Sequence, residues 1–505
     1  MRVVGERALA SAQVRQVGNA AWTDLTRRIE GRVVRPPDSL FGALAAPANT
    51  RYEHVLPHGI VLPTTESDIA AVLGWADKHQ VPVVARSGGH SYAGYSTTGG
   101  LLMRLDMFDQ AAVDLCNATV TVQAGARNRD LLRTLASTGL TLPFGRCPTI
   151  GIAGYTLGGG LGLHTRRLGM ASDRLLATRL VTAGGEVLSC DEDSNADLFW
   201  ASRGGGGGNF GISTAFTYQL CPTPDVTVFR LAFDGRKAEE VLLAMQDLIT
   251  DPQLRYSFAA QFGATATGRD AKRAARNVTL YAEGWYYGPR SNLETILTRV
   301  TSVARPTSSY VAELDGLGAQ RYFTDEVASD PFMTTSVVAR IPMRATDAAR
   351  VVAHLHAWPG SSSRSGASVS FFAMGGADQD MAPDATAFVH RDALFVLAAT
   401  HRWTTEDGPE ASSRATEWIA GVRRDMSAHL GTGSFVNFPD PALPRWWDAY
   451  YGSNYPRLAR IKSEYDPSGL FHYPQSVRPL EQLPSDAQSL SAGRAAIGPC
   501  EGLAS

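Results

Sequence analysis

A glycine loop directly after an apolar strand is the feature that most constrains this chain. Residues 81–85 read Val-Pro-Val-Val-Ala and predict a buried strand, and the loop that follows reads Arg86-Ser-Gly-Gly-His-Ser-Tyr92. Two adjacent glycines allow consecutive backbone N–H groups to form a concave nest, which binds phosphate or pyrophosphate. The loop therefore predicts a phosphate-binding nest from which His90 reaches the group that the phosphates carry.

A second glycine-rich segment carries a lone cysteine. Cys147 lies in Gly145-Arg-Cys-Pro-Thr-Ile-Gly-Ile-Ala-Gly154, and further glycines follow up to Gly162. Glycines without side chains let a backbone approach a ligand closely, so this segment predicts a second binding surface with a nucleophile at its mouth. On its own, a free cysteine is by default a small buried hydrophobe.

Together these motifs resemble the berberine bridge enzyme-like branch of the vanillyl-alcohol oxidase superfamily, which has a PCMH-type FAD-binding domain. The likeness continues in Asp197-Leu-Phe-Trp-Ala-Ser-Arg203, in His390-Arg-Asp-Ala-Leu-Phe395 and between 454 and 476. The resemblance implies FAD attached twice, through His90 to the flavin 8α-methyl and through Cys147 to flavin carbon 6.

The resemblance also implies a wider set of cofactor contacts, including the amide of Asn437 at the flavin pyrimidine edge. The predicted cofactor residues are Arg86, Ser87, Gly88, Gly89, His90, Ser91, Gly145, Cys147, Gly151, Gly154, Gly158, Gly159, Gly162, Ile212 and Asn437. The run Gly204–Gly208 does not indicate NAD binding, because a helical pattern precedes it and a strand follows, the reverse of a dinucleotide fingerprint.

The catalytic base is where this sequence departs from its relatives. Oxidation of an alcohol removes a hydride from carbon and a proton from oxygen, so a positioned base is needed. Many relatives use tyrosines of a Tyr-x-Asn-Tyr segment and another Tyr ahead of a Gly-Gly pair. Here the matching residues are Phe435, Phe438 and Phe372. We expect these three, with Trp403, to form an aromatic substrate pocket.

Three explanations of the missing phenols are open. The substrate is an amine, which loses hydride with help from its own lone pair; or Tyr450, Tyr451 or His401 takes the proton, although packing is the default role of each; or the protein is a flavin carrier. Tyr155 stands where many relatives have histidine, and His164 is a candidate substitute.

The order of predicted elements indicates an α+β fold with two parts. Strands and helices alternate up to a Pro-rich boundary at 221–225, and an antiparallel sheet covered by helices on one face follows. A stretch of Gly and Ser at 360–366 predicts a mobile loop. The expected divisions are a helical lead-in at 1–48, an FAD-binding domain at 49–222, a substrate domain at 226–440, a segment at 445–480 that returns to the FAD domain, and a flexible tail at 485–505.

Composition limits the possible partners and compartment. A net charge of −2 over 505 residues gives no footprint for nucleic acid or anionic membrane, and no run approaches the ~20 apolar residues that span a bilayer. The start lacks an apolar core region, so we expect a cytoplasmic monomer or homodimer, with export left open. Five cysteines without C-x-x-C spacing argue against a metal site, and Cys221 and Cys500 would pair only after export.

These observations predict an FAD-dependent oxidase for a small organic molecule, by analogy an alcohol or amine of bacterial secondary metabolism. Dioxygen would reoxidise the flavin and yield hydrogen peroxide. A carbohydrate oxidase is the alternative within enzymes, and a non-catalytic flavin-binding protein is the alternative from another class.

Overall fold

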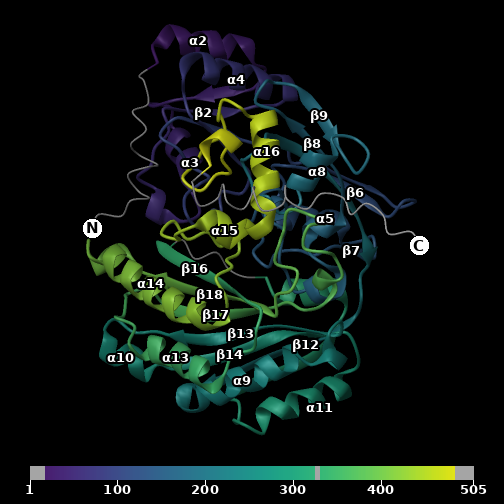
Figure 1. The fold of residues 1–505 in the computed structure, drawn as a ribbon, viewed down its shortest axis with the longest axis vertical. Helices are drawn as coiled ribbons and strands as arrows, with labels where there is room; N and C mark the ends of the chain where they lie inside the picture. Colours follow the sequence, from purple (N-terminus) through teal and green to yellow (C-terminus); the bar gives the residue numbers. More distant parts are fainter. Residues whose placement is uncertain (1–16, 325–329, 484–505) are drawn as a thin grey trace, which may run out of the picture.

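The computed structural model describes residues 17–324 and 330–483, and Figure 1 shows how they are arranged. Two β-sheets with their helices form one half of the molecule, a larger sheet forms the other, and a two-stranded ribbon pairs Leu140–Thr141 with Cys221–Pro222. Cys500, the predicted tail and residues 1–16 of the predicted lead-in lie outside the described residues. Within the described ranges, no helix combines the length and the apolar content needed to cross a membrane.

The first glycine loop follows an edge strand of a four-stranded mixed sheet of order β1-β2-β4-β3. Strand β3 pairs in parallel with β4, and α4 connects β2 to β3. Helix α4 begins where the Thr65 and Asp68 side chains form a reciprocal capping box. The elements are β1 (Arg32–Val34), β2 (Gly59–Leu62), α4 (Glu66–His79), β3 (Val83–Arg86) and β4 (Leu101–Arg104).

The segment 1–48, expected as a lead-in, contributes to this sheet. Strand β1 pairs with β2, and Trp22 and Leu25 of α2 (Asn19–Arg28) are buried in the core, where Trp22 packs against Trp75 of α4. A three-residue strand is too short to give a periodic signal, and its apolar partners are distant in sequence, so the pattern alone did not indicate its place.

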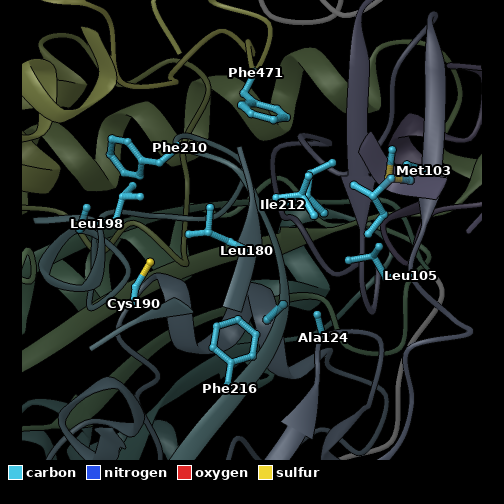
Figure 2. Packing of buried hydrophobic residues seen from close by; sticks show 14 of the residues in the cluster. Met103, Leu105, Ala124, Leu180, Cys190, Leu198, Phe210, Ile212, Phe216 and Phe471 are labelled. Atoms are coloured by element: carbon cyan, nitrogen blue, oxygen red, sulfur yellow. The ribbon is translucent and has the colours of Figure 1, made fainter. Parts of the chain in front are cut away.

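A five-stranded antiparallel sheet packs against the first and shares its core. Its order is β5-β6-β10-β8-β9. Figure 2 shows Met103 of β4 near Ile212 and Leu180, with Phe216 below them and Phe471 of the C-terminal segment above. The strands are β5 (Ala111–Asp114), β6 (Thr119–Gln123), β8 (Leu175–Val181), β9 (Val187–Cys190) and β10 (Ile212–Gln219).

The third sheet is antiparallel and seven-stranded, which confirms the predicted fold class. Its order is β15-β12-β14-β13-β17-β18-β16. The strands are β12 (Val226–Asp234), β13 (Phe258–Ala266), β14 (Val278–Tyr286), β15 (Ser308–Leu314), β16 (Phe332–Ala339), β17 (Ala367–Ala373) and β18 (Phe395–Arg402).

Helices cover one face of this sheet and leave the other face toward the first two sheets. In Figure 1, α9 (Ala238–Ile249), α11 (Arg290–Thr301) and α13 (Ala345–His356) lie at the bottom, away from the smaller sheets. Along β18, side chains alternate between the two faces. Leu397 lies in the helix-covered core, whereas Val396 packs in a separate cluster with Phe435 on the opposite face.

The C-terminal segment returns to the first half of the molecule. Helices α15 (Trp446–Tyr451) and α16 (Tyr455–Tyr465) share the core of the two smaller sheets, and α16 contacts α8 (Ala196–Ala201). The ammonium of Lys462 bonds the carboxylate of Asp466 at 2.5 Å and the carbonyl of Asn209 at 2.7 Å, and both charged side chains are buried.

The segment 360–366 is not the loose loop that its composition predicts. Ser361 donates to the carbonyl of Arg402 and the Ser362 amide to Asp407, and Ser361 and Ser363 are buried. The remaining elements are α3 (Phe41–Ala45), α5 (Asn128–Leu135), β7 (Leu140–Thr141), α6 (Ile152–Leu157), α7 (Thr165–Leu168), β11 (Cys221–Pro222), α10 (Ala271–Arg276), α12 (Gly316–Tyr322) and α14 (Ala411–Leu430), with short 3₁₀ turns between them.

Candidate functional site

A cavity of about 510 Å³ lies between the two glycine segments and the helix-free face of the large sheet. Its volume is in the range of small-molecule and cofactor sites. The sequence-predicted residues in its wall are Ser87, Gly88, Gly89, His90, Ser91, Gly145, Cys147, Gly151, Gly154, Gly162, Ile212, Phe372, Phe435, Asn437, Phe438 and Tyr450. Segments far apart in the sequence therefore meet around one space.

The two glycine segments touch each other through glycine. A Cβ added at Gly88 would lie 2.2 Å from the backbone nitrogen of Gly151, so neither loop could keep its place with a side chain there. Gly89 has φ +75°, a conformation that L side chains rarely adopt. The Ser87 hydroxyl donates to the Ala124 carbonyl at 2.6 Å and fixes the start of the turn.

His90 and Cys147 contact the same hydroxyl group. His90 Nε2 lies 2.9 Å, and Cys147 Sγ 3.3 Å, from Thr149 Oγ1. Burial, with a smaller effect of the nearby Arg127 charge, lowers the pKa of His90 to about 4. The imidazole is therefore neutral at neutral pH and keeps a lone pair, as a nucleophile requires.

Arg86, Gly158 and Gly159 are cofactor predictions that lie outside the cavity wall. The buried Arg86 guanidinium donates to the carbonyls of Leu44, Ala45 and Ala46 and to that of Ser96 at 2.7 Å, so it holds the loop. A Cβ at Gly158 would lie 2.0 Å from Asn437 Oδ1, and a Cβ at Gly159 would lie 3.0 Å from Met170. Gly158 thus supports Asn437, whose Nδ2 donates to the Tyr155 carbonyl at 2.9 Å.

The three phenylalanines predicted for the substrate pocket form an aromatic cluster in the cavity wall. The Phe438 ring is 5.1 Å from the Phe435 ring and 5.2 Å from the Phe372 ring, measured between centroids. Tyr92 stacks on Phe438 at 5.5 Å with the ring planes nearly parallel, and its ring meets the Phe332 ring edge-on. Aromatic contacts of this kind give a rigid apolar surface.

The hydroxyl groups of the two candidate tyrosines, Tyr450 and Tyr451, are hydrogen-bonded to other protein groups. Tyr450 lines the cavity, but its hydroxyl accepts from the Asp440 amide and donates to Gln475 Oε1, each at 3.1 Å. The Tyr451 hydroxyl donates to the Gly205 carbonyl at 3.0 Å, away from the wall. Burial raises the pKa of both phenols, so both stay protonated and are poor bases.

His401 and Trp403 were predicted to face the cleft, and the structure places them in the helix-covered core. His401 Nδ1 accepts from Trp358 Nε1 at 3.1 Å, and its ring lies among Trp358, Trp403 and Trp418. Burial lowers the pKa of His401 to about 4. Strand alternation decides the outcome, because the neighbouring Arg402 faces the cavity instead.

Tyr155 lies in the cavity wall, whereas His164, its candidate substitute, does not. Tyr155 lines the cavity, and its hydroxyl is 3.5 Å from the Pro143 carbonyl. His164 lies outside the wall, where its Nδ1 is 2.8 Å from the Tyr287 hydroxyl and its ring is 4.4 Å from that of Trp285. Burial lowers the pKa of His164 to about 3, so this residue is a neutral packing group.

Tyr92, Arg146 and Arg402 are among the wall residues that were not singled out from the sequence. Tyr92 follows His90 by two positions, Arg146 precedes Cys147, and Arg402 ends β18. Arg146 donates to Glu283 Oε1 and to Gln261 Oε1, each at 2.7 Å, so it joins the second glycine segment to the large sheet. Proximity in sequence to His90 and Cys147 was a usable signal for Tyr92 and Arg146, but not for Arg402.

The wall presents polar atoms that suit a large polar ligand. Among the described residues, the buried Tyr95 Oη and Ser96 Oγ have no hydrogen-bond partner, and both residues line the cavity. Buried polar groups without partners are uncommon in native proteins, and ligands often supply the missing bond. With the glycine nest and Asn437, these groups fit FAD.

Comparison with known proteins agrees with this geometry. Residues 57–191 match the model of an FAD binding domain, and residues 434–478 match the model described as berberine and berberine like. The chain is 31% identical to the FAD-linked oxidoreductase YgaK of Bacillus subtilis (strain 168), over 90% of this chain and 98% of that protein. It is 28% identical to the chitooligosaccharide oxidase of Gibberella zeae, over 84% and 87% of the two chains.

Solved structures show the same architecture. The Physcomitrella patens BBE-like 1 protein superposes with a TM-score of 0.80 at 25% identity, covering 90% of this chain and 98% of the other. A chitooligosaccharide oxidase superposes with a TM-score of 0.79 at 25% identity, covering 91% and 99%.

Proposed function

The chain belongs to the berberine bridge enzyme-like FAD-linked oxidoreductases, and from this premise we propose that it is an oxidase of a small organic molecule, with dioxygen as the electron acceptor. Bound FAD supplies the two-electron acceptor for hydride lost from a substrate carbon. The Gly88–Gly89 nest would bind the pyrophosphate, and Asn437 would meet the pyrimidine edge.

One observation carries the proposal that the flavin is attached twice. The two nucleophiles, from loops 57 positions apart in the chain, contact the single hydroxyl of Thr149. A neutral His90 and the half-buried Cys147 therefore lie together on one wall of the cavity. A flavin edge at that wall would reach both.

The residues of the substrate wall favour an amine over an alcohol. Phe372, Phe435 and Phe438 carry no acid or base, and Tyr450 keeps its proton because of burial. A neutral amine needs no protein base, because its lone pair assists loss of hydride. Oxidation of a carbohydrate is the second candidate, supported by the likeness to a chitooligosaccharide oxidase.

Release of flavin on denaturation tests the attachment. We expect wild-type protein, His90→Ala and Cys147→Ala to keep a yellow precipitate in acid, and the double variant to release its flavin. Cys116→Ala, which removes an exposed thiol, is the matched control. Yellow supernatant from the wild type would end the covalent proposal.

Turnover tests the reaction. Peroxide release is measured in air over amines, alcohols and oligosaccharides, and bleaching of the flavin is followed without oxygen. Bleaching by amines with peroxide release in air is the expected result. Bleaching by no compound would favour the flavin carrier, and bleaching by oligosaccharides alone would favour the carbohydrate oxidase.

A further inference from the structure

A half-buried arginine in the cavity wall, Arg402, has no hydrogen-bond or ion-pair partner among the described residues. The Arg402 side chain makes no hydrogen bond or ion pair to residues 17–324 or 330–483, and its buried Nη1 has no hydrogen-bond partner there. Its guanidinium carbon lies 4.6 Å above the centroid of the Phe332 ring. The backbone of Arg402 is fixed at the end of β18, where it pairs with Phe332 of β16.

Arg402 has no bonded counterion among the described residues. Burial lowers the pKa of its guanidinium, but an arginine side chain stays protonated at neutral pH. Asp330 and Tyr92 act on it electrostatically without forming a hydrogen bond or an ion pair with it. A buried donor without a hydrogen-bond partner is costly, so an anion that enters the cavity would gain an interaction with Nη1 that no described residue makes.

The wall carries positive charge and no carboxylate among its described residues. Among the described residues that line the cavity, there are two arginines and no Asp or Glu. The other arginine, Arg146, is neutralised by Glu283, a residue behind the wall. Arg402 is therefore the wall cation without an ion-paired carboxylate, and it lies beside the aromatic cluster of Tyr92 and Phe438.

We propose that Arg402 binds a carboxylate carried by the substrate, and that the apolar body of this substrate lies against Phe372, Phe435 and Phe438. This inference rests on the proposed function and narrows it to small organic acids. The two guanidinium N–H groups on one side of an arginine match the two oxygens of a carboxylate. A neutral ligand of the same shape would leave Nη1 without a charged acceptor.

Binding of paired probes to the purified holoprotein tests the proposal by calorimetry. Benzoate and phenylacetate are compared with their neutral counterparts, benzamide and phenylacetamide. We expect each carboxylate to bind about tenfold or more tightly than its amide, as hydrogen bonds to charged groups allow. Arg402→Met should remove this preference, and Arg402→Lys should keep part of it.

Controls separate a binding role from a structural one. Arg299→Met removes a partly exposed arginine of α11 that pairs with Asp251, in the turn after α9, and it should leave all four affinities unchanged. Retained flavin content in Arg402→Met would show that the side chain does not serve the FAD phosphates. Equal affinities of carboxylate and amide for wild-type protein would overturn the proposal, whether or not the variant folds.

The two proposals fail in different ways. If the protein carries flavin and releases peroxide but shows no carboxylate preference, the result supports the oxidase and contradicts the proposed role of Arg402. If the protein prefers carboxylates but no compound bleaches its flavin, the anion site stands and the oxidase falls. Loss of flavin from Arg402→Met, with unchanged preference among the probes, would also overturn the inference.

Discussion

His90 Nε2 and Cys147 Sγ lie 2.9 Å and 3.3 Å from one atom, the hydroxyl oxygen of Thr149. The first residue follows β3, and the second lies in the loop before α6. Contact between Gly88 and Gly151 brings these loops together, so the shared hydroxyl depends on two glycines that cannot carry side chains. One polar group thus orients both proposed attachment residues.

Replacing Thr149 by valine removes this shared bond and keeps the shape of the side chain. We expect flavin attachment to slow by about fivefold, the rate equivalent of one lost hydrogen bond of about 1 kcal/mol. The acid-stable fraction of flavin after timed incubation of the apoprotein with FAD gives the rate. Thr149→Ser keeps the hydroxyl and should restore the wild-type rate. Equal rates for Val and wild type would contradict the role of Thr149.

Three glycine-to-alanine changes separate close packing from space for a ligand. Gly158→Ala places a Cβ 2.0 Å from Asn437 Oδ1, so we expect lower thermal stability and lower flavin content. At Gly154 a Cβ meets nothing within 4 Å and the residue lines the cavity, so we expect lost flavin without lost stability of the apoprotein. Gly74→Ala, on an exposed turn of α4, should leave the flavin content unchanged and should raise the stability by up to about 1 kcal/mol. Full flavin content in Gly154→Ala would contradict a cofactor beside that glycine.

Motifs with a local mechanism could be predicted from the sequence. The glycine loop after β3, the cysteine segment and the three phenylalanines all line one cavity, and each belongs to a short motif that is legible in the sequence. The antiparallel sheet with helices on one face also followed from the pattern of strands and helices.

Orientation and distant contacts could not be predicted in the same way. His401 and Arg402 are neighbours on one strand, so their side chains point to opposite faces of the sheet. The sequence did not show which face lines the cavity, and we assigned it to His401, whereas Arg402 lies there. Arg86 matched a cofactor motif, yet its acceptors are carbonyls of a helix some 40 residues earlier. Tyr450 is held by Asp440 and Gln475, which only the fold brings together.

Lys462→Met should strongly destabilise the protein. The change leaves the carboxylate of Asp466 buried without its cation, although two backbone amides still donate to it. Breaking a buried pair typically costs about 3–5 kcal/mol. Urea unfolding measures the loss, and Lys462→Met combined with Asp466→Asn should recover part of it. Unchanged stability of the single variant would show that the pair does not anchor the C-terminal segment.

The buried histidines predict loss of stability in mild acid, and His401 isolates one of them. Its pKa in the folded state is about 4, below the value of about 6.5 expected for an unfolded chain. Between these values the unfolded chain binds a proton that the folded protein refuses, so the free energy of unfolding decreases as the pH falls from 6.5 to 4. The slope from one such group is at most about 1.4 kcal/mol per pH unit.

His401→Gln cannot take up this proton, so its stability should fall less steeply over the same window, as measured by urea unfolding at half-unit steps of pH. His54→Gln, at an exposed position, should keep the wild-type slope. Because His401 lies on the helix-covered face, its variant should also bind the carboxylate probes as the wild type does, which distinguishes its packing role from that of Arg402. Equal slopes for His401→Gln and wild type would mean that the folded core binds this proton as readily as the unfolded chain does, which would contradict the lowered pKa of His401.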